Sequence, residues 1–205
     1  FHGYDFSKFY TGTPLEKAQA ITGGVNFVLD AKAPKRKELF AKEALLLRQA
    51  QSLCSSMTTE EERHTAAYFE AVRSAVMKIT VGGGNGKPLS LKEINSQINE
   101  LLKASIQSEG VINLFESAKM GEKFSLFDPA VLEEIARMKE KNIAVEILRK
   151  LMAEQIAIYK RTNVVQATTF SDKITLLMNT YYNGLITNEE VIKELLKTAE
   201  EINAL

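Results

Sequence analysis

Apolar side chains return every three or four positions through the last third of the chain, from Asp128 to Ile202. This spacing places apolar positions on one side of a helix, so the stretch predicts successive helices that each bury one stripe. The positions that carry the pattern are Val131, Leu132, Ile135, Met138, Ile143, Ile147, Leu148, Leu151, Ile158, Phe170, Ile174, Leu177, Tyr181, Val191, Ile192, Leu195, Leu196, Ala199 and Ile202.

Helix-start signals recur along the whole chain. A Ser or Thr three residues before a Glu allows two reciprocal hydrogen bonds across the first turn, and Asp followed by Pro is a second common start. Such starts occur at Thr13, Thr58, Thr59, Ser90, Asp128 and Thr187. They predict an all-α fold, an irregular bundle of about eight to ten helices with short loops and one glycine-rich connector.

The first half of the chain has a less regular pattern. A helix that begins at Pro14 is expected to end at Gly23-Gly24, and Val25–Asp30 after it is the only strand candidate. A helix after Thr59 buries Tyr68, Phe69, Val72, Val76 and Ile79. Between them, Pro34 opens a helix whose predicted inner face consists of Leu39, Phe40, Leu46, Leu47, Ala50, Leu53 and Cys54.

Three segments follow from these patterns. Residues 1–12 are rich in aromatic side chains without helical periodicity, and the chain begins with Phe1. We expect this segment to continue from an upstream domain and to pack on it, with ligand stacking as the alternative. Residues 13–124 are expected to form one helical subdomain and residues 125–205 a second, C-terminal one.

Composition narrows the class of protein. The 205 residues are 45% hydrophobic and carry 26 basic and 26 acidic side chains, so the chain as a whole is no polycation steered toward nucleic acid. A single cysteine, Cys54, suits a reducing compartment. We find neither a signal peptide nor an apolar run of the roughly 20 residues that span a membrane, and therefore expect a cytoplasmic location and no membrane partner.

Catalytic motifs are incomplete. The loop Gly82–Lys87 is one residue short of a Walker A loop, and Pro88 replaces the hydroxyl residue that reaches magnesium. The only carboxylate two positions before a lysine, Asp30, lacks the acidic partner that nucleases of the PD-(D/E)xK kind require. His64 lies among glutamates and reads as a surface residue. We therefore expect no catalytic, metal or cofactor site in this chain.

One cluster of basic residues stands at a helix start. Cations at that end oppose the helix dipole, so they are not there to stabilise the helix. Either they form a solvated face, or Lys35, Arg36 and Lys37 contact phosphate groups.

Motifs in the chain resemble a known family. In the last third they are R-x-N-V-V-Q at Arg161–Gln166, F-S-x-x-I at Phe170–Ile174, and YYNGLIT at Tyr181–Thr187. Earlier pieces are DFSKFYTGTP, YFEAVRSAVMKIT and EGVINLF. Together they resemble the C-terminal region of the restriction (R, motor) subunit of type I restriction–modification enzymes.

The resemblance implies a function for the chain. In that family an N-terminal nuclease and two helicase-type ATPase domains cut and translocate DNA with ATP and Mg²⁺, and the C-terminal helices attach this motor to the methyltransferase and specificity subunits. It therefore implies an interaction module without its own cofactor, whose subunit reaches DNA through its other domains. Relatives often have a proline after the residue matching Met138; without it, a helix is expected to run on more continuously here.

Two interpretations of Arg161–Gln166 remain open. In the structural one, Asn163 lies at a helix end, Val164 and Val165 are buried, and Gln166 binds a loop carbonyl. In the functional one, Lys160, Arg161, Asn163 and Gln166 lie at the surface that docks the methyltransferase core. A DNA-contacting arm and a helical adaptor unrelated to restriction are the alternative functions.

Charge is distributed unevenly in the last third. Residues 137–161 carry seven cations against three acids, whereas residues 188–205 carry five acids against two lysines. If the two segments pair within the fold, their charges stabilise only the fold. If they do not, the basic helix remains available to a partner.

Overall fold

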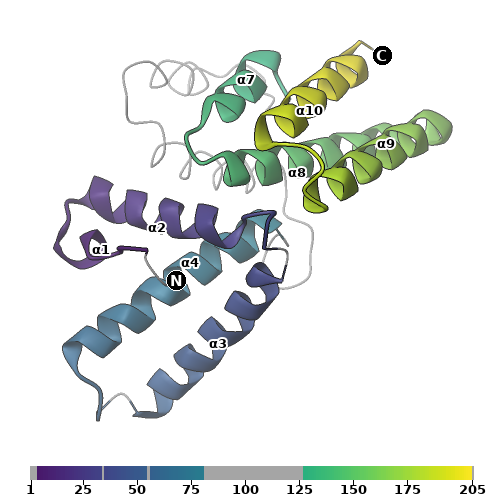
Figure 1. Ribbon diagram of the computed structural model, residues 1–205. Helices are drawn as coiled ribbons and strands as arrows, with labels where there is room; N and C mark the ends of the chain where they lie inside the picture. The colour runs from purple at the N-terminus through teal and green to yellow at the C-terminus, as the bar shows by residue number, and fades with distance from the viewer. Residues whose placement is uncertain (1–3, 34, 55, 81–126, 205) are drawn as a thin grey trace, which may run out of the picture. The chain divides into compact units, whose positions relative to one another are not determined.

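The computed structural model describes residues 4–33, 35–54, 56–80 and 127–204. The chain divides into two compact units, Phe1–Ile94 and Asn95–Leu205, and each is described by itself. Within the described residues, the regular elements are eight helices and no strand, which confirms the all-α prediction (Figure 1). The segment boundaries expected near residues 12 and 124 stay predictions.

The first unit is built on one long helix, α4 (Glu60–Thr80), which packs against both α2 (Pro14–Val28) and α3 (Arg36–Cys54). Figure 1 shows α3 and α4 side by side as a helical hairpin, and the short α1 (Lys8–Thr11) lies against α2. Two predicted starts are confirmed by reciprocal hydrogen bonds, Thr13 with Glu16 and Thr59 with Glu62. Thr58 instead accepts a bond from Gln51.

The predicted stop at Gly23-Gly24 and the predicted strand at Val25–Asp30 are both wrong, because α2 continues through them to Val28. A Cβ on Gly23 would lie 2.0 Å from the Tyr4 hydroxyl, and one on Gly24 would lie 2.3 Å from the Tyr68 hydroxyl. The glycines therefore allow two tyrosines to approach the helix closely, rather than ending it.

Both tyrosines donate hydrogen bonds to one backbone carbonyl of α2. The hydroxyls of Tyr4 and Tyr68 lie 3.0 and 3.1 Å from the Ala20 oxygen. Burial raises the pKa of the Tyr68 hydroxyl, with the neighbouring Tyr4 as a second cause, so Tyr68 is a neutral donor.

Aromatic rings near the start of the chain pack inside this unit. Phe6 stacks on Tyr68 with ring centroids 4.5 Å apart, and Phe9 meets the same ring edge-on at 5.2 Å. These rings therefore have a partner in α4. The expectation that the segment also packs on an upstream domain stays a prediction. The exposed His64 stacks on Tyr10 at 5.3 Å, as fits a surface residue.

The predicted inner face of α3 is also wrong. Ala44 is the only buried residue that the structure describes in this helix, whereas Leu39, Leu46 and Leu53 are 60%, 48% and 86% exposed. The prediction merged two sides of one helix. Phe40 turns toward Phe69 of α4, and the three leucines, each seven residues from the next, share another side.

The second unit surrounds helix α8 (Lys141–Tyr159). Three helices contact it: α7 (Pro129–Arg137), α9 (Val164–Tyr182) and α10 (Asn188–Asn203). Nine residues of α8 are buried, and the predicted apolar positions of α7, α9 and α10 supply most of the surrounding core. Ile158 departs from the prediction, since it is exposed near the end of α8. Predicted starts are confirmed at Asp128 and Thr187.

The junction between α7 and α8 corrects a further expectation. We expected a more continuous helix here, yet α7 ends at Arg137 and Met138 has an extended backbone with φ −51° and ψ 142°. Met138 is buried, and the Lys141 ammonium donates to the Ala136 carbonyl at 2.7 Å. Burial of Met138 and this bond to an orphan helix-end carbonyl stabilise the break without a proline. None of the described helices is long and apolar enough to cross a membrane.

Candidate partner-binding site

The corner between α8 and α9 is fixed by backbone hydrogen bonds. The Tyr159 carbonyl accepts bonds from the Thr162 and Asn163 amides, both at 3.0 Å, and from the Thr162 hydroxyl at 2.9 Å. The Lys160 amide donates to the Ile156 carbonyl at 2.8 Å. These bonds close the end of α8 in a tight turn, so only four residues separate it from the next helix.

Side chains of this corner bind one another. Asn163 accepts a bond from the Gln166 amide at 3.1 Å and donates to the Gln166 side-chain oxygen at 3.1 Å. The Tyr159 hydroxyl donates to the same oxygen at 3.1 Å. The prediction of Asn163 at a helix end is confirmed. The prediction of Gln166 at a loop carbonyl is wrong, because its oxygen accepts from two side chains.

The structure brings basic and apolar side chains together at this corner. Lys160 and Arg161 are exposed at the turn. Val164 and Val165, predicted to be buried, are 58% and 79% exposed. They occupy the first turn of α9 on its outer side, while Ala167 faces the core. We call Lys160, Arg161, Val164 and Val165 the corner surface.

Beyond the corner, the outer side of α9 carries little charge. Between Val164 and Tyr182 the only charged residues are Asp172 and Lys173. Thr168, Thr169 and Thr175 each donate to the carbonyl four residues earlier, at 2.9, 3.2 and 2.8 Å. Their hydroxyls are therefore satisfied within the helix. Our sequence prediction missed this face, although the scarcity of charge in the stretch was visible.

A buried ion pair removes one cation from the surface of α8. Glu146 is 5% exposed and accepts bonds from Arg149 at 3.1 and 2.9 Å, and from the Tyr182 hydroxyl. Burial alone would lower the pKa of Arg149, but the negative charge of Glu146 has the larger effect, so the pKa of Arg149 is raised. Burial, followed by the Glu146 charge, raises the pKa of Tyr182. Arg149 is thus paired within the fold and is not offered to a partner, and loss of either member would leave a buried charge unpaired.

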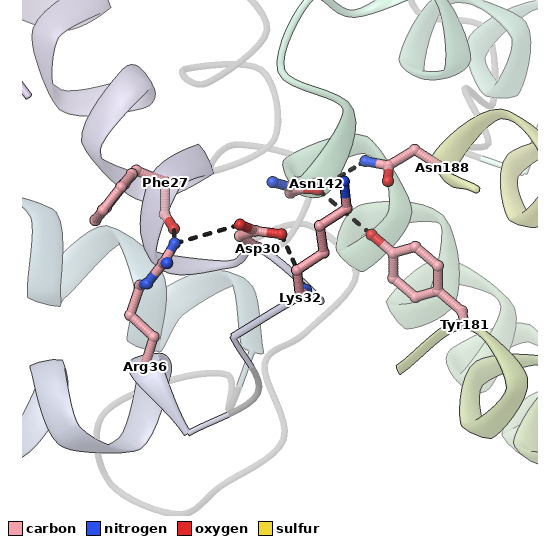
Figure 2. A network of polar contacts seen from close by, with 7 residues as sticks. All are labelled: Phe27, Asp30, Lys32, Arg36, Asn142, Tyr181 and Asn188. Atoms are coloured by element: carbon pink, nitrogen blue, oxygen red, sulfur yellow. Dashed lines mark hydrogen bonds and ion pairs between the residues drawn. The ribbon is translucent and has the colours of Figure 1, made fainter. Parts of the chain in front are cut away.

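The far end of α9 is tied to α8 by a second polar group. In Figure 2, the amide oxygen of Asn142 accepts bonds from Asn188 at 2.7 Å and from the Tyr181 hydroxyl at 3.4 Å. Gly184 next to it has a positive φ of 72°, which ends α9 in the left-handed conformation. The YYNGLIT motif therefore sets the turn from α9 to α10, and its role in the described structure is architectural.

The ion pairs around the basic segment are local. Arg137 pairs with Glu133 and Glu134 on its own helix at 3.2 Å, and Arg149 pairs with Glu146. The acidic α10 contributes Glu201, which pairs with Lys173 of α9 at 2.6 Å. None of these pairs joins the basic segment 137–161 to the acidic segment 188–205.

The predicted phosphate-contact residues belong to the first unit. Arg36 donates to the Phe27 carbonyl at 2.7 Å and pairs with Asp30 at 3.4 Å, and its guanidinium lies 4.2 Å from the centroid of the Phe27 ring (Figure 2). Arg36 therefore closes the turn between α2 and α3. Lys35 is exposed and Lys37 is half-buried. A phosphate role for Lys35, Arg36 and Lys37 stays a prediction.

Several sequence features lie outside the described residues: the loop Gly82–Lys87, the helix predicted after Ser90, and the EGVINLF motif. Among the described residues, no group of three or more His, Cys, Asp or Glu side chains is arranged to hold a metal ion.

Comparisons with known proteins point to one family. A family model described as "Type I restriction enzyme HindI endonuclease subunit-like, C-terminal" matches residues 1–205. The HindI endonuclease subunit of Haemophilus influenzae is 26% identical over 168 residues, which is 81% of this chain and 16% of that protein. A putative MjaIXP endonuclease subunit of Methanocaldococcus jannaschii is 24% identical over 136 residues, 66% of this chain and 13% of that protein. No solved structure matches the chain significantly.

Proposed function

Because the chain belongs to the family of C-terminal regions of type I restriction enzyme endonuclease subunits, we propose that it is the helical module that attaches such a subunit to the methyltransferase and specificity subunits. The chain spans only about a sixth of the HindI subunit's length, at 16%. We propose that nuclease and ATPase chemistry, with ATP, Mg²⁺ and DNA, belongs to the remainder of such a subunit in the cytoplasm. Family membership excludes an adaptor unrelated to restriction.

The corner surface is the observation that carries the proposal. Apolar side chains beside an exposed arginine, with little further charge, resemble the composition of protein interfaces, in which arginine is enriched and other charges are depleted. Val164 and Val165 are exposed, whereas Phe170, Ile174 and Met178 of the same helix are buried. The side-chain bonds among Tyr159, Asn163 and Gln166 hold the corner in one conformation, which lowers the entropy cost of binding.

Each predicted partner-contact residue has a role in this proposal. Lys160 and Arg161 meet carboxylates of the methyltransferase core, and the planar guanidinium of Arg161 can bind one carboxylate through two hydrogen bonds. Asn163 and Gln166 position the turn, because their side-chain groups already bind each other.

Binding of the purified chain to the methyltransferase–specificity complex of the same system tests the proposal. We expect Arg161→Glu to slow association roughly tenfold or more at low salt, since charges at the edge of an interface mainly steer encounter. The melting temperature should stay within a few degrees. Lys197→Glu makes the same charge change at an exposed position of α10 and should leave binding unchanged.

A second variant separates binding from folding. Val165→Glu places a carboxylate in the apolar part of the corner surface and should weaken binding without changing the helix content. If both variants bind like the unaltered chain, the corner surface is not the docking site. Duplex DNA in the same assay tests the alternative that the chain is a DNA-contacting arm. The contacts of Arg36 with Phe27 and Asp30 weaken this alternative, because they already engage the Arg36 guanidinium.

A further inference from the structure

Among the described residues of the first unit, most of the exposed large apolar side chains lie on α3, and three of them form a line of leucines. Leu39, Leu46 and Leu53 are each seven residues from the next, so they lie on one side of the helix at intervals of about 10 Å. Ala50, also exposed, lies between the last two. We call Leu39, Leu46, Ala50 and Leu53 the leucine stripe. A seven-residue repeat allows one helix to pack along another; here leucine occupies one position of each repeat, and the second contact position holds Lys42 or Gln49.

The three leucines of the stripe are placed symmetrically about Leu46, and the position that mirrors Ala50 is Lys42. Leu39 and Leu53 lie at equal distances from Leu46 along α3. An antiparallel copy of the same helix, related by a two-fold axis at Leu46, therefore sets Leu46 against its own mate and Leu39 against Leu53. Such an isologous contact is self-complementary and closes at two copies.

Charges at the two ends of the stripe complement each other. Exposed Lys32 and Lys35 precede its first leucine, and exposed Glu60 and Glu61 follow its last. In the antiparallel arrangement, the lysines of one copy lie toward the glutamates of the other. A parallel arrangement would instead set Lys35 and Lys42 against the same lysines of the second copy, and like charges that face each other across an interface are unfavourable.

A pocket beside the stripe offers space for the incoming leucine. It has a volume of about 380 Å³, lies between α3 and α4, and is lined in part by Ala50, Cys54 and Ala66. Ala50 and Cys54 flank Leu53 on the helix surface. In the antiparallel arrangement, Leu39 of the second copy lies against Leu53, next to this pocket.

We propose that the chain forms a two-fold symmetric dimer through antiparallel pairing of its α3 helices along the leucine stripe. The occupant of the stripe is thus a second copy of the chain. The symmetric leucines, the complementary charges and the pocket support this assignment over a partner of another kind. The dimer involves the first unit only and does not depend on the docking role of the corner surface.

Sedimentation equilibrium of the 205-residue chain tests the proposal. A mass that rises with concentration from 22.9 kDa toward twice that value is expected. Leu46→Glu sets two carboxylates against each other at the axis and should raise the dissociation constant roughly 100-fold. Leu176→Glu changes a 70% exposed leucine of α9 in the same way and should leave the dimer intact. Since both leucines are exposed, helix content should not change in either variant.

Cross-linking tests the direction of the pairing. In a Cys54→Ser background, a mixture of Leu39→Cys and Leu53→Cys chains should form disulfide-linked heterodimers, whereas Leu39→Cys alone should not. Cross-linking of Leu39→Cys with itself would indicate a parallel pairing and overturn the proposal. A chain that remains at 22.9 kDa at several hundred micromolar would also overturn it and leave the stripe to a different protein.

Discussion

Helices α3 and α8 have the same length, 19 residues, and each repeats aliphatic side chains at helical spacing. Nine residues of α8 are buried, against one of α3. The difference lies in their neighbours. Helix α8 is contacted by α7, α9 and α10, whereas α3 packs mainly along α4. An apolar stripe therefore marks the side of a helix that can be buried, and the number of helices packed against it decides whether it is buried.

This difference has consequences for stability and for binding. Burial of α8 contributes to the free energy of unfolding of its own unit, because each buried aliphatic side chain contributes roughly 1.5–3 kcal/mol. The leucines of α3 contribute little to the fold and are available for contacts with another molecule. The apolar residues of α8 thus stabilise the second unit, whereas the leucines of α3 remain exposed on the first unit.

The largest effect should come from matched leucine substitutions in these two helices. Leu148→Ala removes a buried side chain of α8 and leaves a cavity, so we expect it to destabilise the second unit by about 2–5 kcal/mol. Leu46→Ala on α3 should change stability by about 0.5 kcal/mol or less. Urea unfolding at a dilute protein concentration, followed by circular dichroism, measures both. Equal losses of unfolding free energy in the two variants would show that Leu46 is buried as Leu148 is.

Glycine positions in α2 give an intermediate effect. Replacing a glycine by alanine in an ordinary helix interior raises the free energy of unfolding by about 0.5–1 kcal/mol. At Gly24 the added Cβ would meet the hydroxyl of Tyr68, which is fully buried, and Val72 at 3.0 Å. We therefore expect destabilisation by about 1–3 kcal/mol. Gly24→Ala combined with Tyr68→Phe, which removes that hydroxyl, should recover part of the loss. A stabilised single variant would contradict the close-packing explanation.

Whether the sequence predicts a structural feature depends on how far apart in the sequence the interacting residues lie. Starts at Thr13, Asp128 and Thr187 were predicted correctly because capping bonds join residues at most three positions apart. The stop at Gly23-Gly24 was wrong because the reason for those glycines, Tyr4 and Tyr68, lies elsewhere in the sequence. No local pattern identifies a tyrosine that approaches from another segment.

The candidate site shows the same limit. Sequence placed Asn163 at a helix end, since its capping bond is local. The exposure of Val164 and Val165 was missed because apolar residues at a helix start are commonly buried, and only the packing of α9 on α8 decides which side faces out. The low charge of the outer side of α9 was present in the sequence, but its position depended on that same packing.

The smallest effect concerns the capping boxes, which the two units share despite their different burial. In the second unit, the Glu190 carboxylate accepts a bond from the Thr187 amide at 2.7 Å, and Thr187 accepts one from the Glu190 amide at 3.3 Å. The bond from the Thr187 backbone amide, followed by the Thr187 side chain, lowers the pKa of Glu190 below its ordinary value of 4.5. Glu16 and Glu62 in the first unit have lowered pKa values for the same reason.

The sign of the pH dependence follows from that direction. A carboxyl group whose pKa is lower in the folded state stabilises the fold above its unfolded pKa and loses this contribution as the pH falls through the folded value. Stability should therefore decline as the pH drops below about 4.5. Glu190→Gln keeps a hydrogen-bond acceptor but cannot titrate, so its unfolding free energy should depend less steeply on pH in that range. Glu189→Gln removes a carboxylate from the same turn while keeping both Thr187–Glu190 bonds, and should retain the steeper dependence. Identical slopes for the two variants, measured by urea unfolding between pH 3 and pH 6, would show that the capping bond does not set the acid sensitivity of α10.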